Sequence, residues 1–146
     1  METWEKLKAL QDKDELEFKY HLRNLLKKSQ SEKIDDFIFI MNEFKRELLY
    51  NSLFFIDILN ENFFYFFLES REAQPNYEKL MQIAEIMAPI GDKDTLEVFF
   101  HILKKMPRHD GYYPILMNYY GEIEHKISFL EKKIDKFRLY PPKSLI

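Results

Sequence analysis

The sequence contains no cysteine and only three glycines in 146 residues. Without cysteine, the chain can form neither a disulfide nor a thiolate metal site, and it has no cysteine nucleophile. Scarce glycine argues against a sheet built from tight hairpins, because the preferred hairpin turns use Asn-Gly or Asp-Gly. The one such pair, at 110–111, lies between two segments with helical periodicity. A phosphate-cradling glycine loop, a GxSxG motif and an HExxH motif are also missing.

Long apolar runs are missing as well. The first residues, METWEKLKALQDKDE, contain no apolar core of a signal peptide. The most apolar stretch, NENFFYFFLES at 60–70, is shorter than the roughly 20 apolar residues that span a bilayer. We therefore expect no membrane segment and a cytoplasmic protein.

The same stretch holds five consecutive aromatic residues at 63–67. In a helix, five consecutive positions point in every direction around the axis, which is typical of a helix buried on most sides. We predict a central core helix here. The alternative is a partly exposed aromatic face that binds a partner. Asp57, the one acid in the preceding apolar run, is expected to face solvent, since an unpaired buried carboxylate is costly.

Composition and periodicity indicate a folded all-α protein. Hydrophobic residues make up 46% and charged residues 32% of a chain whose length suits one domain. Apolar residues recur every three to four positions along nearly the whole chain. We expect a single domain over 1–146, with an irregular tail at 138–146 because Pro141 and Pro142 bar a longer helix. The predicted helices cover 3–10, 14–28, 31–50, 53–73 as one or two pieces, 76–90, 93–106 and 114–138.

Two architectures fit these six to seven helices. The segments pair as 14–28 with 31–50, 52–73 with 76–90, and 93–106 with 113–138, which gives a repeat of about 40 residues. That spacing is typical of HEAT-like antiparallel helical pairs. The other architecture is a compact helical bundle, and both have a long C-terminal helix.

The C-terminal helix has an unbroken heptad pattern. Such a pattern predicts either a helix lying along its own bundle or a seam for a second copy, since both share one period. A homodimer through residues 116–137 is therefore an alternative. The seam residues are Leu116, Tyr120, Ile123, Ile127, Leu130, Ile134 and Phe137.

Charge is distributed unevenly along the chain. Residues 51–125 hold 12 acidic and 6 basic residues, whereas 126–146 hold 2 acidic and 6 basic ones. An acidic central region fits poorly to a phosphate backbone, so we expect no nucleic-acid partner. An acidic surface suits a basic protein partner, because opposite potentials speed association.

Histidine and acid pairs offer one route to an enzyme. Glu122 and His125 have the Glu-x-x-His spacing of di-iron bundles, but such a site needs two of these units and two further glutamates. His109 and Asp110 form a dyad like that of all-α metal phosphohydrolases, with His101 eight residues upstream. A helical metal-dependent hydrolase or metal-binding protein is thus an alternative. The preferred interpretation is a surface ion pair and a turn, with no catalytic residue, no metal and no cofactor.

Three segments resemble the small, acidic, HEAT-like immunity proteins of bacterial polymorphic toxin systems. They are DDFIFIM at 35–41, GDKDTLEVFFHILKKM at 91–106 and HDGYYPILMNYYGEIEH at 109–125. The resemblance covers about half the chain. It implies a non-enzymatic protein that neutralises a cognate toxin by covering its active site.

These observations favour a protein-binding domain with an acidic surface, whose partner is a basic toxin domain. A dimeric structural or regulatory helical protein is a further alternative. Aromatic side chains in loops are frequent anchors of interfaces. The predicted partner-binding residues are Asp92, Asp94, Glu97, Asp110, Tyr112 and Tyr113.

Overall fold

The computed structural model describes residues 2–11, 13–29, 33–69 and 76–139. Within these ranges the chain is helical, without strands, which confirms the predicted all-α fold and its long C-terminal helix. The helices are α1 (Glu2–Leu10), α2 (Glu15–Lys28), α3 (Ile34–Glu43), α4 (Lys45–Tyr50), α5 (Ser52–Glu69), α6 (Tyr77–Met87), the 3₁₀ turn η3 (Ala88–Ile90), α7 (Lys93–Lys105) and α8 (Tyr113–Leu139).

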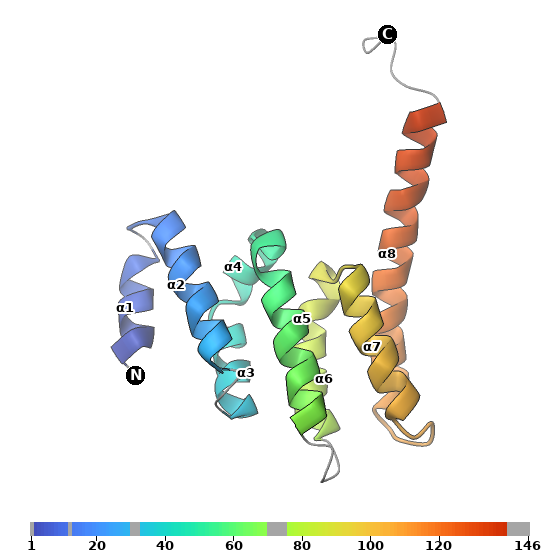
Figure 1. Ribbon diagram of the computed structural model, residues 1–146, viewed down its shortest axis with the longest axis horizontal. Coiled ribbons are helices and arrows are strands. Elements are labelled where there is room, and N and C mark those ends of the chain that lie inside the picture. Colours follow the sequence, from blue (N-terminus) through green and yellow to red (C-terminus); the bar gives the residue numbers. More distant parts are fainter. Residues whose placement is uncertain (1, 12, 30–32, 70–75, 140–146) are drawn as a thin grey trace.

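The helices form two layers of antiparallel pairs (Figure 1). Helices α2, α5 and α7 lie side by side in one layer, where α5 packs against both of the others. Helices α3, α6 and α8 form the second layer, in which α6 packs against α3 and α8. The first-layer helices begin at residues 15, 52 and 93, about 40 residues apart as predicted. Each pair therefore covers one flank of the pair before it.

The structure divides one of the predicted helices. The segment predicted as one helix at 31–50 is divided at Phe44, whose backbone leaves the helical region (φ −115°, ψ 25°) and whose ring is buried. The segment at 53–73, predicted as one or two helices, forms the single helix α5 over the described residues. The predicted helix start at residue 31 and the predicted helix end at residue 73 lie outside the described residues.

Side-chain caps fix three of the helix starts. The Asp14 carboxylate accepts a hydrogen bond from the amide of Glu17, and the Asn76 side chain accepts one from the amide of Lys79. At α7, Asp92 and Thr95 form a reciprocal capping box. Such caps satisfy amide groups that have no partner within the helix, and each stabilises it by about 1 kcal/mol.

The aromatic stretch lies at the centre of the molecule, as predicted. Helix α5 contacts α2, α4, α6 and α7, and Phe63, Phe66 and Phe67 are buried. The Phe63 ring packs on Phe99 of α7 with ring centroids 5.3 Å apart. Burial on several sides explains why this helix has no polar stripe.

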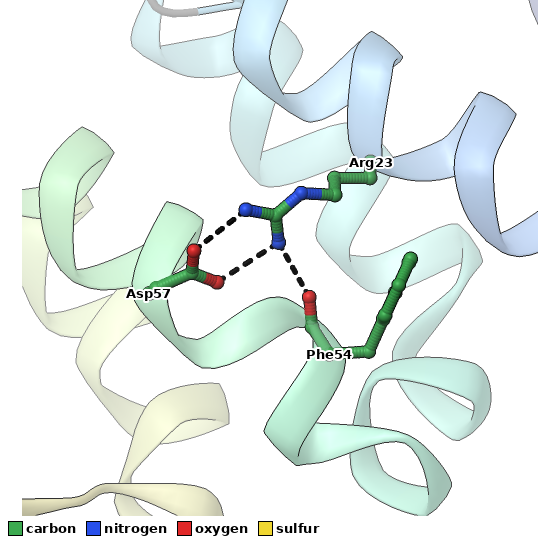
Figure 2. A network of polar contacts seen from close by, with 3 residues as sticks. All are labelled: Arg23, Phe54 and Asp57. Atoms are coloured by element: carbon green, nitrogen blue, oxygen red, sulfur yellow. Dashed lines mark hydrogen bonds and ion pairs between the residues drawn. The ribbon is translucent and has the colours of Figure 1, made fainter.

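Asp57 is exposed, as predicted, and it has a partner in the neighbouring helix (Figure 2). The Arg23 guanidinium donates two parallel hydrogen bonds to the Asp57 carboxylate, at 2.9 and 2.6 Å, and a third to the carbonyl oxygen of Phe54. It also lies over the Phe54 ring. The bonds from Arg23 lower the pKa of Asp57, although partial burial opposes this shift. This bidentate pair joins α2 to α5.

We expect Asp57→Asn to lower the free energy of unfolding by about 0.5–1 kcal/mol at pH 7, since the Asp57 side chain is 62% exposed and solvent screens the pair. The folded-state pKa of Asp57 lies below its unfolded value. The wild-type advantage is therefore present above about pH 4 and is lost as the pH falls through the folded pKa. Urea unfolding of both proteins at pH 7 and pH 3 measures this, and an equal difference at the two pH values would contradict it.

Helix α8 extends beyond the helical stack (Figure 1). Its 27 residues span about 40 Å, against about 20 Å for the 13 residues of α7. The seam residues Leu116 and Ile123 are buried, as expected for a helix lying along its own stack. Leu130 and Ile134, farther along, are 50% and 52% exposed. Among the helices described, none is long and apolar enough to cross a membrane.

Candidate functional site

The hairpin formed by α7 and α8 contains every residue predicted to bind a partner, either on its helices or in its flanking loops. Two contacts fix its antiparallel register. The Lys93 ammonium lies 2.8 Å from the Glu131 carboxylate, and the Phe100 ring contacts Tyr120 with centroids 6.4 Å apart. The hairpin is seated on the stack at Gly91, where an added Cβ would lie 2.6 Å from Cδ1 of Ile123. A larger residue at position 91 would therefore force the Ile123 side chain of α8 to move.

A groove of about 510 Å³ runs between the exposed flanks of α7 and α8. Phe100 and Met117 in its wall are 50% and 42% exposed, although both are large apolar side chains. Exposed apolar surface gathered in one concave place is typical of binding sites. We call this feature the α7–α8 groove. Its lining residues are Phe100, Leu103, Lys104, Met106, Arg108, Tyr113, Met117 and Tyr120.

Charge changes sign along the hairpin. Asp94 and Glu97 are exposed in the first turns of α7, and the register places exposed Glu124, one turn beyond Tyr120, at the same end. We call these three residues the acidic end. The opposite end of the groove carries Lys104 and Arg108. Glu97 lies on the same side of α7 as Lys104, seven residues later, whereas Asp94 lies on the side of His101. The groove side of α7 therefore carries an acid at one end and cations at the other.

The Asp92 carboxylate makes hydrogen bonds within the protein. Its Oδ1 accepts hydrogen bonds from the Thr95 amide (3.0 Å) and from the side-chain amide of Asn60 in α5 (3.1 Å). The Thr95 hydroxyl donates to the Asn60 carbonyl oxygen at 2.6 Å, and both of these side chains are buried. Asp92 thus anchors α7 to α5.

The other predicted residues lie at two ends of one helix. Asp94 and Glu97 are in the first turns of α7, whereas Asp110, Tyr112 and Tyr113 follow its last turn. About 12–17 Å of helix separates the two acids from the helix end that the other group follows. The structure therefore places them along one hairpin without bringing them into one cluster, and their role in binding stays a prediction.

Near the loop after α7, polar contacts hold the predicted aromatic residues in place. The Asp110 carboxylate accepts a hydrogen bond from the Tyr112 amide at 2.9 Å, which fixes the turn. Tyr112 and Tyr113 are half-buried, and Tyr113 lines the groove.

Tyr77, the first residue of α6, lies near the same loop. Burial raises the pKa of Tyr77, and the negative charge of Asp110 raises it further.

At the other end of the hairpin, a lysine ties α8 to η3. The Lys126 ammonium donates to the carbonyl oxygen of Pro89 at 2.9 Å. Burial lowers the pKa of Lys126, and the charge of Asp92 opposes this shift.

The sequence analysis did not predict the groove, because it did not separate the directions in which Phe99 and Phe100 point. Consecutive helical residues point about 100° apart, so adjacent rings on a helix that is buried on one side only need not both face the core. Phe99 is buried, and Phe100 lies on the exposed flank. The groove could have been predicted from the adjacent pair Phe99-Phe100, together with the basic residues Lys104 and Arg108 one and two turns later.

The residues considered for a metal site lie apart. The His101 ring packs edge-on against Phe64 and Phe67 of α5, while His109 is exposed in the loop after α7. Glu122 and His125 are exposed on α8. Over the described part of the chain, histidines and carboxylates form no group of three or more that could hold a metal ion.

Comparison of the chain with protein-family models, with curated proteins and with solved structures finds no significant match.

Proposed function

We propose that this chain is a non-enzymatic protein-binding domain that acts as an immunity protein and neutralises a protein toxin through the α7–α8 hairpin. The observation that carries the proposal is the exposed flank of this hairpin, where an acidic end adjoins a groove lined by aromatic side chains. Interfaces draw most of their binding energy from a few aromatic anchors, while charges steer association and select the partner.

The acidic end fits a cationic cleft on the partner. Asp94 and Glu97 are three residues apart and therefore neighbours on one helical face. Covering the catalytic cleft of a toxin needs no reactive group on the covering protein, only a complementary shape and charge. The resemblance of three segments to HEAT-like immunity proteins supports the same role.

The test is growth rescue in a bacterial host. The protein encoded next to this chain is expected to arrest growth when expressed alone, and co-expression of this chain is expected to restore growth. Asp94→Lys with Glu97→Lys should abolish rescue, because the reversed charges would repel a cationic cleft. Glu5→Lys with Glu78→Lys, which reverses exposed acids on α1 and α6, should rescue like wild type. A harmless neighbour, or no rescue by wild type, would overturn the proposal.

The exposed end of α8 favours a second candidate function, a dimeric structural or regulatory protein. Leu130 and Ile134 continue the heptad seam past the stack and are about half exposed. Dimerisation through them predicts twice the monomer mass in sedimentation analysis and a return to monomer on Ile134→Asp. A wild-type monomer at the highest soluble concentration would exclude this candidate.

A further inference from the structure

The α7–α8 groove lies at the open end of a repeating stack. Within the described helices, α5 covers the flank of α2 and α7 covers the flank of α5. Helix α7 faces α5 through Phe99 and His101, which contact aromatic rings of that helix. Its Phe100 flank instead meets Tyr120 of α8 and borders the groove. In a stack of helical pairs, this is the place where the next helix would pack.

The groove lacks the polar surface that a solvent-facing end of a helical stack usually has. Terminal repeats of helical stacks need a polar outer face to remain soluble. Here the walls include Phe100, Tyr113, Met117 and Tyr120, and the first and third of these are among the exposed large apolar side chains. A helix with an apolar stripe would fill such a groove by the same packing that joins the helical pairs.

The positive charge beside the apolar wall favours a partner that carries acidic side chains. Lys104 and Arg108 are the charged residues that line the groove, and both are exposed. The Lys104 ammonium lies 4.9 Å from the centroid of the Phe100 ring, so the cation sits directly against the apolar surface. A helix docked there would place its flanking side chains next to these two cations.

We infer that the α7–α8 groove binds an amphipathic helix of a partner protein, with the apolar stripe against Phe100 and Met117 and acidic side chains paired with Lys104 and Arg108. The acidic end, with Glu97 and Glu124, disfavours acidic side chains at the other end of the groove and so orients the bound helix. This inference deepens the proposed function and rests on it for a protein partner, but it concerns a different part of the hairpin from the acidic end.

Two synthetic helical peptides test it. Both have about 18 residues and the same leucine stripe at every third or fourth position. The other positions of one half carry glutamate in the first peptide and lysine in the second, and those of the other half carry glutamine in both. Fluorescence polarisation should show that the acidic peptide binds the wild-type chain at least tenfold more tightly, with affinity that falls as salt is added. Lys104→Glu with Arg108→Glu should reverse this preference. Lys27→Glu with Lys45→Glu, on exposed lysines of α2 and α4, should leave it unchanged.

Binding of neither peptide would overturn the inference, as would equal binding of both or a preference unaffected by the Lys104 and Arg108 changes. A third variant, Met117→Lys, should weaken both peptides, since it places a charge in the apolar wall. Circular dichroism of each variant confirms that the fold is retained. Growth rescue without peptide discrimination would leave the proposed function standing and remove only the helix-binding groove. Discrimination between the peptides without growth rescue would keep the helix-binding groove and overturn the proposed function.

Discussion

Phe63→Ala is expected to lower the free energy of unfolding by about 3–5 kcal/mol. The Phe63 side chain is fully buried in α5 and packs on Phe99 of α7. Truncation removes this contact and the apolar surface that it buries, and it leaves a cavity at the junction of two helices that the rigid neighbours fill only in part. Urea denaturation followed by circular dichroism measures the loss.

Leu53→Ala is the matched control for this change. Leu53 lies in the first turn of the same helix, and its side chain is 94% exposed. The control should therefore change stability by no more than about 0.5 kcal/mol. Similar effects at the two positions would show that α5 is not the central helix of the stack.

Asn62→Asp is expected to cost about 4 kcal/mol at pH 7 and little at pH 4. The Asn62 side chain is 1% exposed, and its amide donates a hydrogen bond of 2.7 Å to the carbonyl oxygen of Leu26 in α2. A carboxylate placed there would be buried and would face an acceptor. The new carboxyl group would instead stay protonated and donate to the same carbonyl, at a cost of about 1.4 kcal/mol for each pH unit above its unfolded pKa of about 3.9.

The direction of the pH dependence follows from this raised folded-state pKa. Below about pH 4 the carboxyl group is neutral in both states, and the variant should approach wild-type stability. As the pH rises, the unfolded chain loses the proton first and stability falls. Asn118→Asp, at an exposed position of α8, should show no such pH-dependent loss. A variant equally weakened at pH 4 and pH 7 would contradict the hydrogen bond to Leu26.

Periodicity predicted the elements well because burial in this protein follows helical spacing. The start of α7 at Lys93 and the burial of the aromatic stretch could both be predicted from local residue patterns. The break at Phe44 could not, because no proline or glycine marks it in the sequence. The Arg23–Asp57 pair could not be predicted either, since 34 residues separate its partners along the chain.

The candidate site was predicted only in part. The acids at the start of α7 and the tyrosines after its end were chosen as one neighbourhood, yet the length of α7 separates them. Asp92 was selected for its charge, but its hydrogen bonds to Asn60 and Thr95 depend on the packing of α5 against α7. The groove itself arises from the angle and register of two helices, and no linear pattern encodes those directly.

Amide hydrogen exchange of the chain with and without the acidic helical peptide tests most directly whether the outer flank of the α7–α8 hairpin is the working surface. Bound peptide should slow exchange across residues 97–124 and leave α2 and α3 unchanged. Protection confined to α1–α3, or no protection in the hairpin at saturating peptide, would contradict the account.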